Sequence, residues 1–350
     1  MTAGHLGQRV APEGMVAVPR MTIAQLAEAA GVSVPTVSKV LNGRKDVSPG
    51  TRARIEQLIS EHGYQRRRTG ARSGPRLLDL VFNSLGNPWA LQVVRGVEGA
   101  ASAQGVEVVL SECSVGRTPR QEWLDSVLAR RPTGVIMVFS DLEPDQRTQL
   151  EARGIPYVVV DPAGDDEGGA PSIGSANFDG GLMATRHLVE LGHRRIAVVG
   201  GPRDTVPSRA RVAGHRDALA HAGLGADLVR WGDFSVESGH AHGRELLSGP
   251  DRPSAVFAGN DLQAIGVYRA AHELGLSVPH DLSVVGYDDL PVADWIIPGL
   301  TTVHQPLLEM ADAATKLVLA LAEGEQPPVL RMDLAVHLVV RGSTSAPARP

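Results

Sequence analysis

Apolar residues recur at helical spacing in a segment that starts at residue 21. Thr22, with Gln25 three residues later, has the pattern of a capping box, and Gly31 ends the predicted helix after about two turns. The apolar face of this helix consists of Ile23, Leu26, Ala27 and Ala30. Ser33 is then placed to cap a second short helix over residues 34–41. Two short helices joined by a turn that contains glycine predict a helix-turn-helix.

The second helix divides its residues between a packing side and an outward side. The residues expected to pack toward the first helix are Val37, Val40 and Leu41. The residues left to face outward are Val34, Pro35, Thr36, Ser38 and Lys39. Pro35 fits the first turn, where its missing N–H would have no intrahelical partner. Because Ser48-Pro49 begins a third helix, residues 21–64 are expected to form one small all-α domain.

Beyond residue 76, short apolar runs alternate with helical stretches. A first series of runs spans residues 77–82, 106–110, 134–139 and 157–160. A second series spans residues 195–199, 255–258 and 282–285. Apolar strands separated by helices are typical of parallel sheets covered on both faces, so the two series predict an α/β core of two lobes over residues 77–342. Open parallel sheets bind ligands at the carboxyl ends of their strands, and we expect a small molecule to bind between the lobes.

Charge is distributed unevenly along the chain. Residues 1–76 contain 12 Lys and Arg against 5 Asp and Glu, and the remainder contains 22 against 34. A basic beginning on an acidic body favours a polyanion-binding module, because cationic side chains release counterions from phosphates, although a solvated basic tail would have the same charge. Residues 65–76 are basic, contain Gly and Pro and lack apolar positions, which predicts a linker. Residues 1–20 and 343–350 are expected to be a disordered leader and a disordered tail.

Composition and motifs exclude several classes of protein. Cys113 is the only cysteine among the 350 residues and no signal peptide is recognisable, so the cytoplasm is the expected location. No apolar run approaches the roughly 18 residues of a membrane-spanning helix. No phosphate-binding loop, nucleophile elbow or His-Glu-x-x-His motif occurs, and the 12 histidines are scattered. We therefore expect neither an enzyme nor a membrane protein, and no cofactor or metal site.

Residues 21–43, which read MTIAQLAEAAGVSVPTVSKVLNG, closely resemble the N-terminal motif of the LacI/GalR family of transcriptional regulators. The resemblance continues in the core at residues 191–197 (LGHRRIA), 259–261 (GND), 283–289 (SVVGYDD) and 300–303 (LTTV). It implies a helix-turn-helix head on a periplasmic-binding-protein-like core. Members of this family act as dimers that bind double-stranded operator DNA, and their DNA affinity changes when a small effector, often a sugar, binds.

The resemblance also assigns residues of the head to DNA. Val34, Pro35 and Lys39 would read bases, with Lys39 reaching a guanine edge and the apolar pair touching a thymine methyl group. The residues assigned largely to the DNA backbone are Thr22, Ser33, Thr36, Ser38, Asn42, Thr51 and Arg52. Arg44 adds positive charge. Thr22 and Ser33 also fit the role of helix caps, and one hydroxyl can serve both purposes.

The linker departs from the pattern of the family. Ser73 stands where the family usually has a leucine that enters the minor groove, and Gly70 weakens any helix by about 1 kcal/mol relative to alanine. We hypothesise that Arg66, Arg67 and Arg68 instead approach the minor groove electrostatically.

For the crevice, the resemblance implies seven effector-binding residues: Asn87, Trp89, Asp161, Arg211, Phe234, Asn260 and Asp288. All except Arg211 and Phe234 lie within a few residues of a predicted strand end, which supports the assignment independently. Amide, guanidinium and carboxylate groups would bond hydroxyls, whereas Trp89 and Phe234 would stack on sugar faces or else belong to the core. Asp261 and Asp289 are interpreted as helix caps. We expect a sugar rather than a nucleobase.

These features predict a sequence-specific DNA-binding regulator whose operator affinity is controlled by an effector bound between the lobes. We expect a homodimeric repressor, because a pair of helix-turn-helix heads reads two half-sites related by twofold symmetry. The alternatives are an activator, a sugar-acting enzyme and a solute-binding protein. The last two are disfavoured by the missing catalytic motifs, the missing export signal and the basic head.

Overall fold

The computed structural model describes residues 22–41, 47–62, 76–112, 118–140, 142–164, 169–225 and 228–348. These residues form two compact units, a helical head before residue 63 and a core from residue 76. Several predictions lie outside the described residues, namely those on the leader 1–20, on most of the linker 65–76, and on Asn42, Arg44, Arg66, Arg67 and Arg68. Arg76, the last residue of the predicted linker, is the first residue of a strand.

The head contains the three helices expected from the sequence: α1 (Ile23–Ala30), α2 (Val34–Leu41) and α3 (Pro49–His62). Thr22 caps α1 in a capping box, in which its backbone N–H donates to Gln25 Oε1 at 2.8 Å. Gly31 ends α1 in the left-handed conformation, which glycine adopts without steric cost. The helices pack around a small apolar core with fully buried residues from all three, Leu26, Val37 and Ile55.

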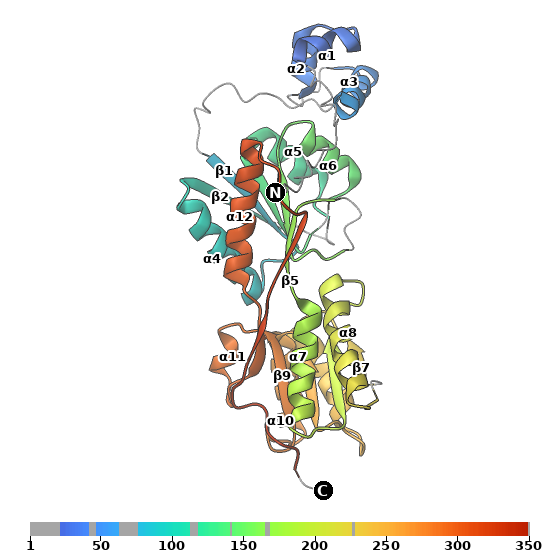
Figure 1. The fold of residues 1–350 in the computed structure, drawn as a ribbon, viewed down its shortest axis with the longest axis vertical. Helices are drawn as coiled ribbons and strands as arrows, with labels where there is room; N and C mark the ends of the chain where they lie inside the picture. The colour runs from blue at the N-terminus through green and yellow to red at the C-terminus, as the bar shows by residue number, and fades with distance from the viewer. Residues whose placement is uncertain are drawn as a thin grey trace, which may run out of the picture. The chain divides into compact units, whose positions relative to one another are not determined.

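The first lobe is built on a six-stranded parallel sheet. Its strands, in spatial order, are β11 (Arg331–Leu334), β5 (Ser172–Ser175), β4 (Tyr157–Val160), β3 (Gly134–Val138), β1 (Arg76–Phe82) and β2 (Val106–Glu112). Helices α4 (Pro88–Ser102) and α12 (Leu307–Glu323) lie side by side over one face, as Figure 1 shows. Helices α5 (Gln121–Arg130) and α6 (Pro144–Glu151) cover the other face. Coverage on both faces explains why the central strands read as apolar runs.

The second lobe repeats this plan. Its strands, in spatial order, are β12 (His337–Val339), β10 (Thr301–His304), β9 (Ser283–Asp288), β8 (Ala255–Ala258), β6 (Ile196–Gly200) and β7 (Val229–Trp231). All pairs are parallel except β10 with β12. Helices α7 (Asn177–Glu190) and α8 (Val206–His221) cover one face. Helices α9 (Val236–Leu247), α10 (Asp261–Glu273) and the short α11 (Val292–Trp295) pack on the other.

The backbone passes between the two lobes three times. It crosses from β5 into α7, from β10 into α12, and from β11 into β12 (Figure 1). The crossing segments are short, two residues each from Gln305 to Pro306 and from residue 335 to 336. Because the lobes meet at these crossings, the carboxyl ends of strands from both sheets can face one cavity.

Five strands were not predicted from the sequence: β5, β7, β10, β11 and β12. Each has only three or four residues, and most lack a continuous apolar run. Strand β5 reads SIGS, and its two serines are nevertheless buried because neighbouring strands and helix α12 enclose them. Strand β12 also makes one edge of the second sheet antiparallel, where the sequence predicted parallel strands.

The prediction of a disordered tail from residue 343 is wrong for residues 343–348. Ser343 is fully buried, and its hydroxyl donates to Val284 O at 2.6 Å and accepts from Thr301 N at 2.8 Å. Ser345 N donates to Ser283 Oγ at 3.1 Å. The segment supplies hydrogen-bond partners to the starts of β9 and β10, which periodicity cannot reveal because these partners are far apart in sequence.

Candidate functional site

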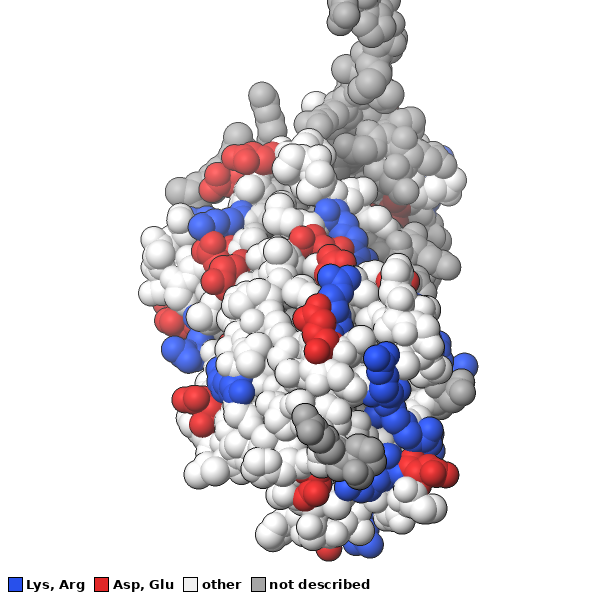
Figure 2. Space-filling view, turned by 60° about the horizontal axis from the view of Figure 1, so that its bottom comes forward, with Lys and Arg blue, Asp and Glu red and all other residues white. Residues whose placement is uncertain are grey.

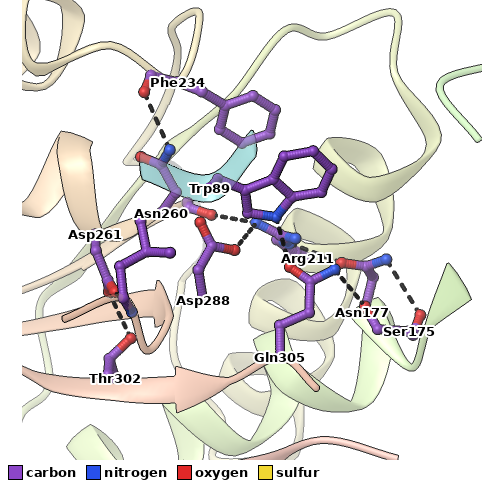
Figure 3. A network of polar contacts seen from close by, with 12 residues as sticks. Trp89, Ser175, Asn177, Arg211, Phe234, Asn260, Asp261, Asp288, Thr302 and Gln305 are labelled. Atoms are coloured by element: carbon purple, nitrogen blue, oxygen red, sulfur yellow. Dashed lines mark hydrogen bonds and ion pairs between the residues drawn. The ribbon is translucent and has the colours of Figure 1, made fainter. Parts of the chain in front are cut away.

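A cavity of about 490 Å³ lies at the carboxyl ends of strands from both lobes. The first lobe contributes residues that follow β1, β3 and β4, and the second contributes residues that follow β7 and β8 or end β9. All seven residues expected to bind an effector line this cavity: Asn87, Trp89, Asp161, Arg211, Phe234, Asn260 and Asp288. Figure 3 shows how most of them converge. The structure therefore brings together groups that are spread over 200 residues of sequence.

Among the described residues that line the cavity, Arg211 is the only cation, and several contacts fix the position of its side chain. Its Nε donates to Asn177 Oδ1 at 2.7 Å, and its Nη1 donates to the carbonyl oxygen of Gly259 at 2.6 Å. The guanidinium lies 3.6 Å from the centre of the Tyr287 ring, a cation–π contact. Nη1 is also 3.6 Å from Asp288 Oδ1. These contacts hold a 3% exposed guanidinium at the cavity wall.

The packing of two helices places Arg211 there. A Cβ on Gly181 of α7 would lie 2.0 Å from the carbonyl oxygen of Arg211, and a Cβ on Gly214 of α8 would lie 2.0 Å from that of Phe178. Only glycine permits such a close approach of the two backbones. The close seam between α7 and α8 therefore sets the depth of the Arg211 side chain.

Two aspartates face this guanidinium from buried positions. Asp161 and Asp288 are each 4% exposed, and burial raises the pKa of both above the ordinary value for aspartate. The positive charge of Arg211 offsets part of that rise. Among the described residues, Asp288 Oδ1 accepts no hydrogen bond. The site thus holds carboxylate oxygens that are ready to accept hydrogen bonds from a ligand.

The two asparagines of the site also begin helices. Asn87 Oδ1 accepts from Ala90 N at 2.9 Å at the start of α4. Asn260 Oδ1 accepts from Gln263 N at 2.8 Å at the start of α10, and its Nδ2 donates to Phe234 O. Capping uses the oxygen of each amide and fixes the orientation of the side chain.

The interpretation of Asp261 and Asp289 as helix caps is wrong, because Asn260 caps α10 and the residue at the N-cap of α11 is Pro291. Asp261 is buried and accepts from Thr302 Oγ1 at 2.6 Å and from Leu290 N at 2.7 Å. Burial raises its pKa to about 7. Asp289 pairs with Arg341 at 2.8 Å and bonds His304 at 3.0 Å.

Aromatic rings occupy opposite walls of the cavity. Trp89 comes from the first lobe, and its Nε1 donates to Gln305 Oε1 at 3.3 Å. Phe234 comes from the second lobe and meets Phe139 of the first lobe edge to face, with ring centroids 6.3 Å apart. Phe139 was missed from the sequence, where it read as the last residue of an apolar strand. Phe234 proves to lie three residues beyond the unpredicted strand β7.

Four lining residues adopt the left-handed backbone conformation that favours glycine: Phe139 (φ 50°), Asp161 (49°), Phe234 (67°) and Asp288 (104°). Each such residue costs about 1–3 kcal/mol and persists only where the surrounding structure enforces it. Such strain clusters at ligand sites, so its concentration in one lining supports a functional role for the cavity.

The head presents the residues expected to contact DNA on its surface. Val34, Pro35 and Lys39 are exposed, while Val37 and Val40 between them are buried. Thr36 and Ser38 are partly exposed. The predicted division of α2 into a packing side and an outward side is therefore confirmed at these positions.

The hydroxyl and guanidinium candidates of the head also make local bonds. Ser33 Oγ lies 2.9 Å from Thr36 Oγ1 and accepts from Thr36 N at 3.4 Å, as expected of a helix cap. Thr51 Oγ1 lies 2.7 Å from Ser48 Oγ at the start of α3. Arg52 forms an ion pair with Glu56 at 3.8 Å.

The described residues contain no group of three or more His, Cys, Asp or Glu side chains that could hold a metal ion. No helix in the described part of the chain is long and apolar enough to cross a membrane.

Comparison with known proteins relates both units to characterised families. Residues 22–67 match the family of bacterial regulatory proteins of the lacI type, and residues 185–344 match a periplasmic binding protein-like domain. The ribose operon repressor of Escherichia coli (strain K12) is 33% identical over 330 residues, which cover 92% of this chain and 99% of that protein.

Solved structures of transcriptional regulators are also similar to this chain over most of its length. A complex of the transcriptional regulator CelR with cellobiose is 35% identical, with a TM-score of 0.70 over 93% of this chain and 100% of that one. A lac repressor dimer bound to operator and the anti-inducer ONPF is 31% identical, with a TM-score of 0.69 over 94% of this chain and 100% of that one.

Proposed function

Because this chain belongs to the LacI family of bacterial regulatory proteins, we propose that its head binds operator DNA through α2 and that its cavity binds a sugar that changes DNA affinity. It is a DNA-binding transcriptional regulator. The observation that carries the effector site is the convergence of seven residues, chosen from sequence alone, on one cavity between the lobes.

The chemistry of α2 suits a major groove. Val34 is 41% exposed and stands beside Pro35, which gives the start of the helix a small apolar surface for a thymine methyl group. Lys39 is exposed one turn further on and can reach a guanine edge. The first backbone N–H groups of the helix and the hydroxyls of Ser33 and Thr36 suit phosphate.

We extend the proposal to residues of the head and of the linker that the structure does not describe. Asn42 and Arg44 follow α2 directly, and Arg66, Arg67 and Arg68 lie in the linker, so we propose that they contact the DNA backbone and the minor groove. We also propose the boundaries 21–64 for the head, and we extend the expected core of residues 77–342 to include Arg76 and residues 343–348.

The cavity suits a polyol. Asp161 and Asp288 supply acceptors, the Asn87 and Asn260 side chains are held in fixed orientations, and Trp89 and Phe234 supply apolar faces. Sugars present this combination of hydroxyl groups and flat apolar patches. We propose that the ligand contacts both lobes at once. Its binding would then fix the angle between the lobes, which changes by bending at the three crossing segments.

We propose a repressor that acts as a homodimer in the cytoplasm. The relatives above include a ribose operon repressor and a lac repressor dimer on its operator. A dimer of heads reads two half-sites, which requires palindromic DNA. These relatives are regulators, and we propose that this chain likewise catalyses no reaction on its effector.

Selection of DNA from a randomised duplex pool with the purified full chain tests this function. We expect enrichment of a palindrome, and a measurable change of its affinity in fluorescence polarisation when a panel of sugars is added. Lys39→Ala is expected to abolish the enrichment at one position of each half-site. Binding that is indifferent to sequence, or a sugar that is chemically converted by the protein, would refute the proposal.

A further inference from the structure

The lining of the cavity is strongly unbalanced in charge. Among the described residues that line it, the ionisable side chains are four carboxylates, Asp161, Asp233, Glu237 and Asp288, against the single cation Arg211. On the face of the molecule that Figure 2 presents, acidic and basic residues lie interspersed. The lining of the cavity is more one-sided than that face, and a charged ligand would experience the imbalance at close range.

The one cation is already engaged by the protein. Arg211 Nε donates to Asn177 (Figure 3), and its Nη1 donates to the Gly259 carbonyl. The flat face of the guanidinium lies on the Tyr287 ring. Its nearest charged neighbour is Asp288. A phosphate or carboxylate ligand needs a guanidinium that can offer two parallel N–H groups. These partners use Nε and one N–H of Nη1, and the neighbouring Asp288 carboxylate offsets part of the positive charge that would attract an anion.

Asp288 points to the kind of group that does fit. Its Oδ1 is buried and accepts no hydrogen bond from the described residues, and the contact to Arg211 Nη1 at 3.6 Å is too long for one. A buried carboxylate oxygen without a donor is costly, so a donor from the ligand would relieve it. A sugar hydroxyl donates, whereas a fully ionised phosphate or carboxylate group only accepts.

Asp233 and Glu237 extend the negative charge from the buried wall to the exposed edge of the cavity. Asp233 lies in the turn between β7 and α9, Glu237 follows at the start of α9, and both side chains are exposed. Asp233 Oδ1 is held by Ser235, whose N and Oγ donate to it at 3.0 and 2.5 Å. Glu237 lies in the first turn of α9. An anionic ligand would therefore meet negative charge both on entry and on binding.

We propose that this cavity accepts an uncharged, hydroxyl-rich effector and excludes the phosphorylated or carboxylated form of the same sugar, with Asp233 and Glu237 as specificity-determining residues. The proposal rests on the proposed function only in treating the cavity as the effector site. Exclusion of a wrong partner by like charge is a familiar route to specificity.

Quenching of tryptophan fluorescence by small ions tests the proposal without knowledge of the effector. The difference in emission between the wild-type chain and Trp89→Phe isolates Trp89, one of four tryptophans. Each quenching constant is divided by that of free N-acetyltryptophanamide with the same ion, because the two ions differ in intrinsic efficiency. On this relative scale caesium should quench Trp89 more strongly than iodide, on the order of threefold at low ionic strength, because the cavity concentrates cations. The double variant Asp233→Asn/Glu237→Gln should lower that ratio about twofold.

The matched control carries the same change of charge elsewhere. Glu107 is exposed near the start of β2, and Asp251 is exposed in the segment that precedes β8. Both lie at the amino ends of strands, away from the cavity. Glu107→Gln/Asp251→Asn should leave the ratio unchanged. Equal relative quenching constants for the two ions in the wild type, or an equal response of both double variants, would overturn the proposal.

Matched ligands give the second readout. Ribose with ribose 5-phosphate, and cellobiose with cellobionate, are compared by titration calorimetry with the full chain. Whichever neutral sugar binds should do so at least about tenfold more tightly than its anion. An anion that binds as tightly as its neutral partner would overturn the proposal, and if no sugar of the set binds, quenching decides alone. Neither readout uses DNA, so failure of operator binding would refute the proposed function and leave this inference standing.

Discussion

The head and the cavity solve recognition in opposite ways. The head places its candidate base-reading residues on one exposed helix of eight residues, so that Val34 and Lys39 reach outward while Val37 holds the helix in place. The cavity collects its contacts from six separate segments and buries most of them, and Arg211 and Asp288 are each about 4% exposed or less. Substitutions in the head should therefore alter DNA binding alone, whereas substitutions in the cavity should also alter the stability of the core.

The substitution Arg211→Leu is expected to have the largest effect on the stability of the core and therefore tests this contrast most strongly. The change leaves Asp161 and Asp288 without their buried counter-charge, and we expect the free energy of unfolding of the core to fall by about 3–5 kcal/mol. Effector binding should be lost. Urea unfolding at pH 7 measures the change. Arg216→Leu on the exposed side of the same helix is the control and should stay within about 0.5 kcal/mol. Equal losses in both variants would contradict the assigned role of Arg211.

Gly181→Ala tests the seam that positions Arg211. Its new Cβ would overlap the carbonyl oxygen of Arg211, so α7 and α8 must separate, and we expect a loss of about 1–3 kcal/mol together with weaker effector binding. Gly99→Ala in α4 is the matched control. A Cβ there meets nothing within 4 Å, and the same substitution should stabilise the protein by about 0.5–1 kcal/mol. Denaturant midpoints that shift in the same direction for both would argue against a close seam.

Lys39→Ala tests the other side of the comparison. We expect it to reduce discrimination at one operator base pair by about 1–3 kcal/mol, because a lysine contact to a guanine edge is lost. Unfolding of the core should not change. Lys316→Ala, which removes an exposed ammonium paired with Asp312 at 2.7 Å, should leave operator binding intact. A fall in core stability with Lys39→Ala would break the separation between recognition by the head and stability of the core.

A change of pH is expected to have the smallest net effect on the stability of the core, because the titration of its buried acids and that of its buried bases change stability in opposite directions. Burial raises the pKa of Asp261 to about 7, so its contribution to stability is full below pH 4 and is lost as pH rises toward 7. Burial lowers the pKa of His215 to about 3, so its contribution is present above pH 6.5 and is lost as pH falls toward 3.

Variants separate the two groups. Between pH 6.5 and 4, Asp261→Asn should make stability fall more steeply on acidification, and His215→Gln should make it rise. Urea midpoints at a series of pH values measure both slopes. The same slope in both variants would show that other groups dominate the titration of the core.

The sequence predicted the head almost completely. Caps and terminators such as Thr22, Gly31 and Ser48 act on residues only a few positions away, so local pattern is sufficient to place the three helices. In the core the same is true of the long apolar strands. Strands β5 and β12 escaped prediction because partners far along the chain, not their own residues, hold them in the sheets.

The site followed a similar rule. The resemblance in sequence identified residues at strand ends, and the fold brings them together. Phe139, Asp233 and Glu237 were missed because their importance comes from where the turns after β3 and β7 lie in space. The capping by Asn260 instead of Asp261 was missed because the two neighbours carry similar groups, and only the structure shows that Asp261 turns toward Thr302.

The three crossings between the lobes also bear on how the chain is made. The first sheet lacks its edge strand β11 until residue 334 has left the ribosome, although its other five strands are complete by residue 175. The second sheet waits for β12, only a few residues later. During synthesis the head can therefore fold early and alone, while both lobes mature together at the end of translation, with the aspartates of the cavity exposed to water until then.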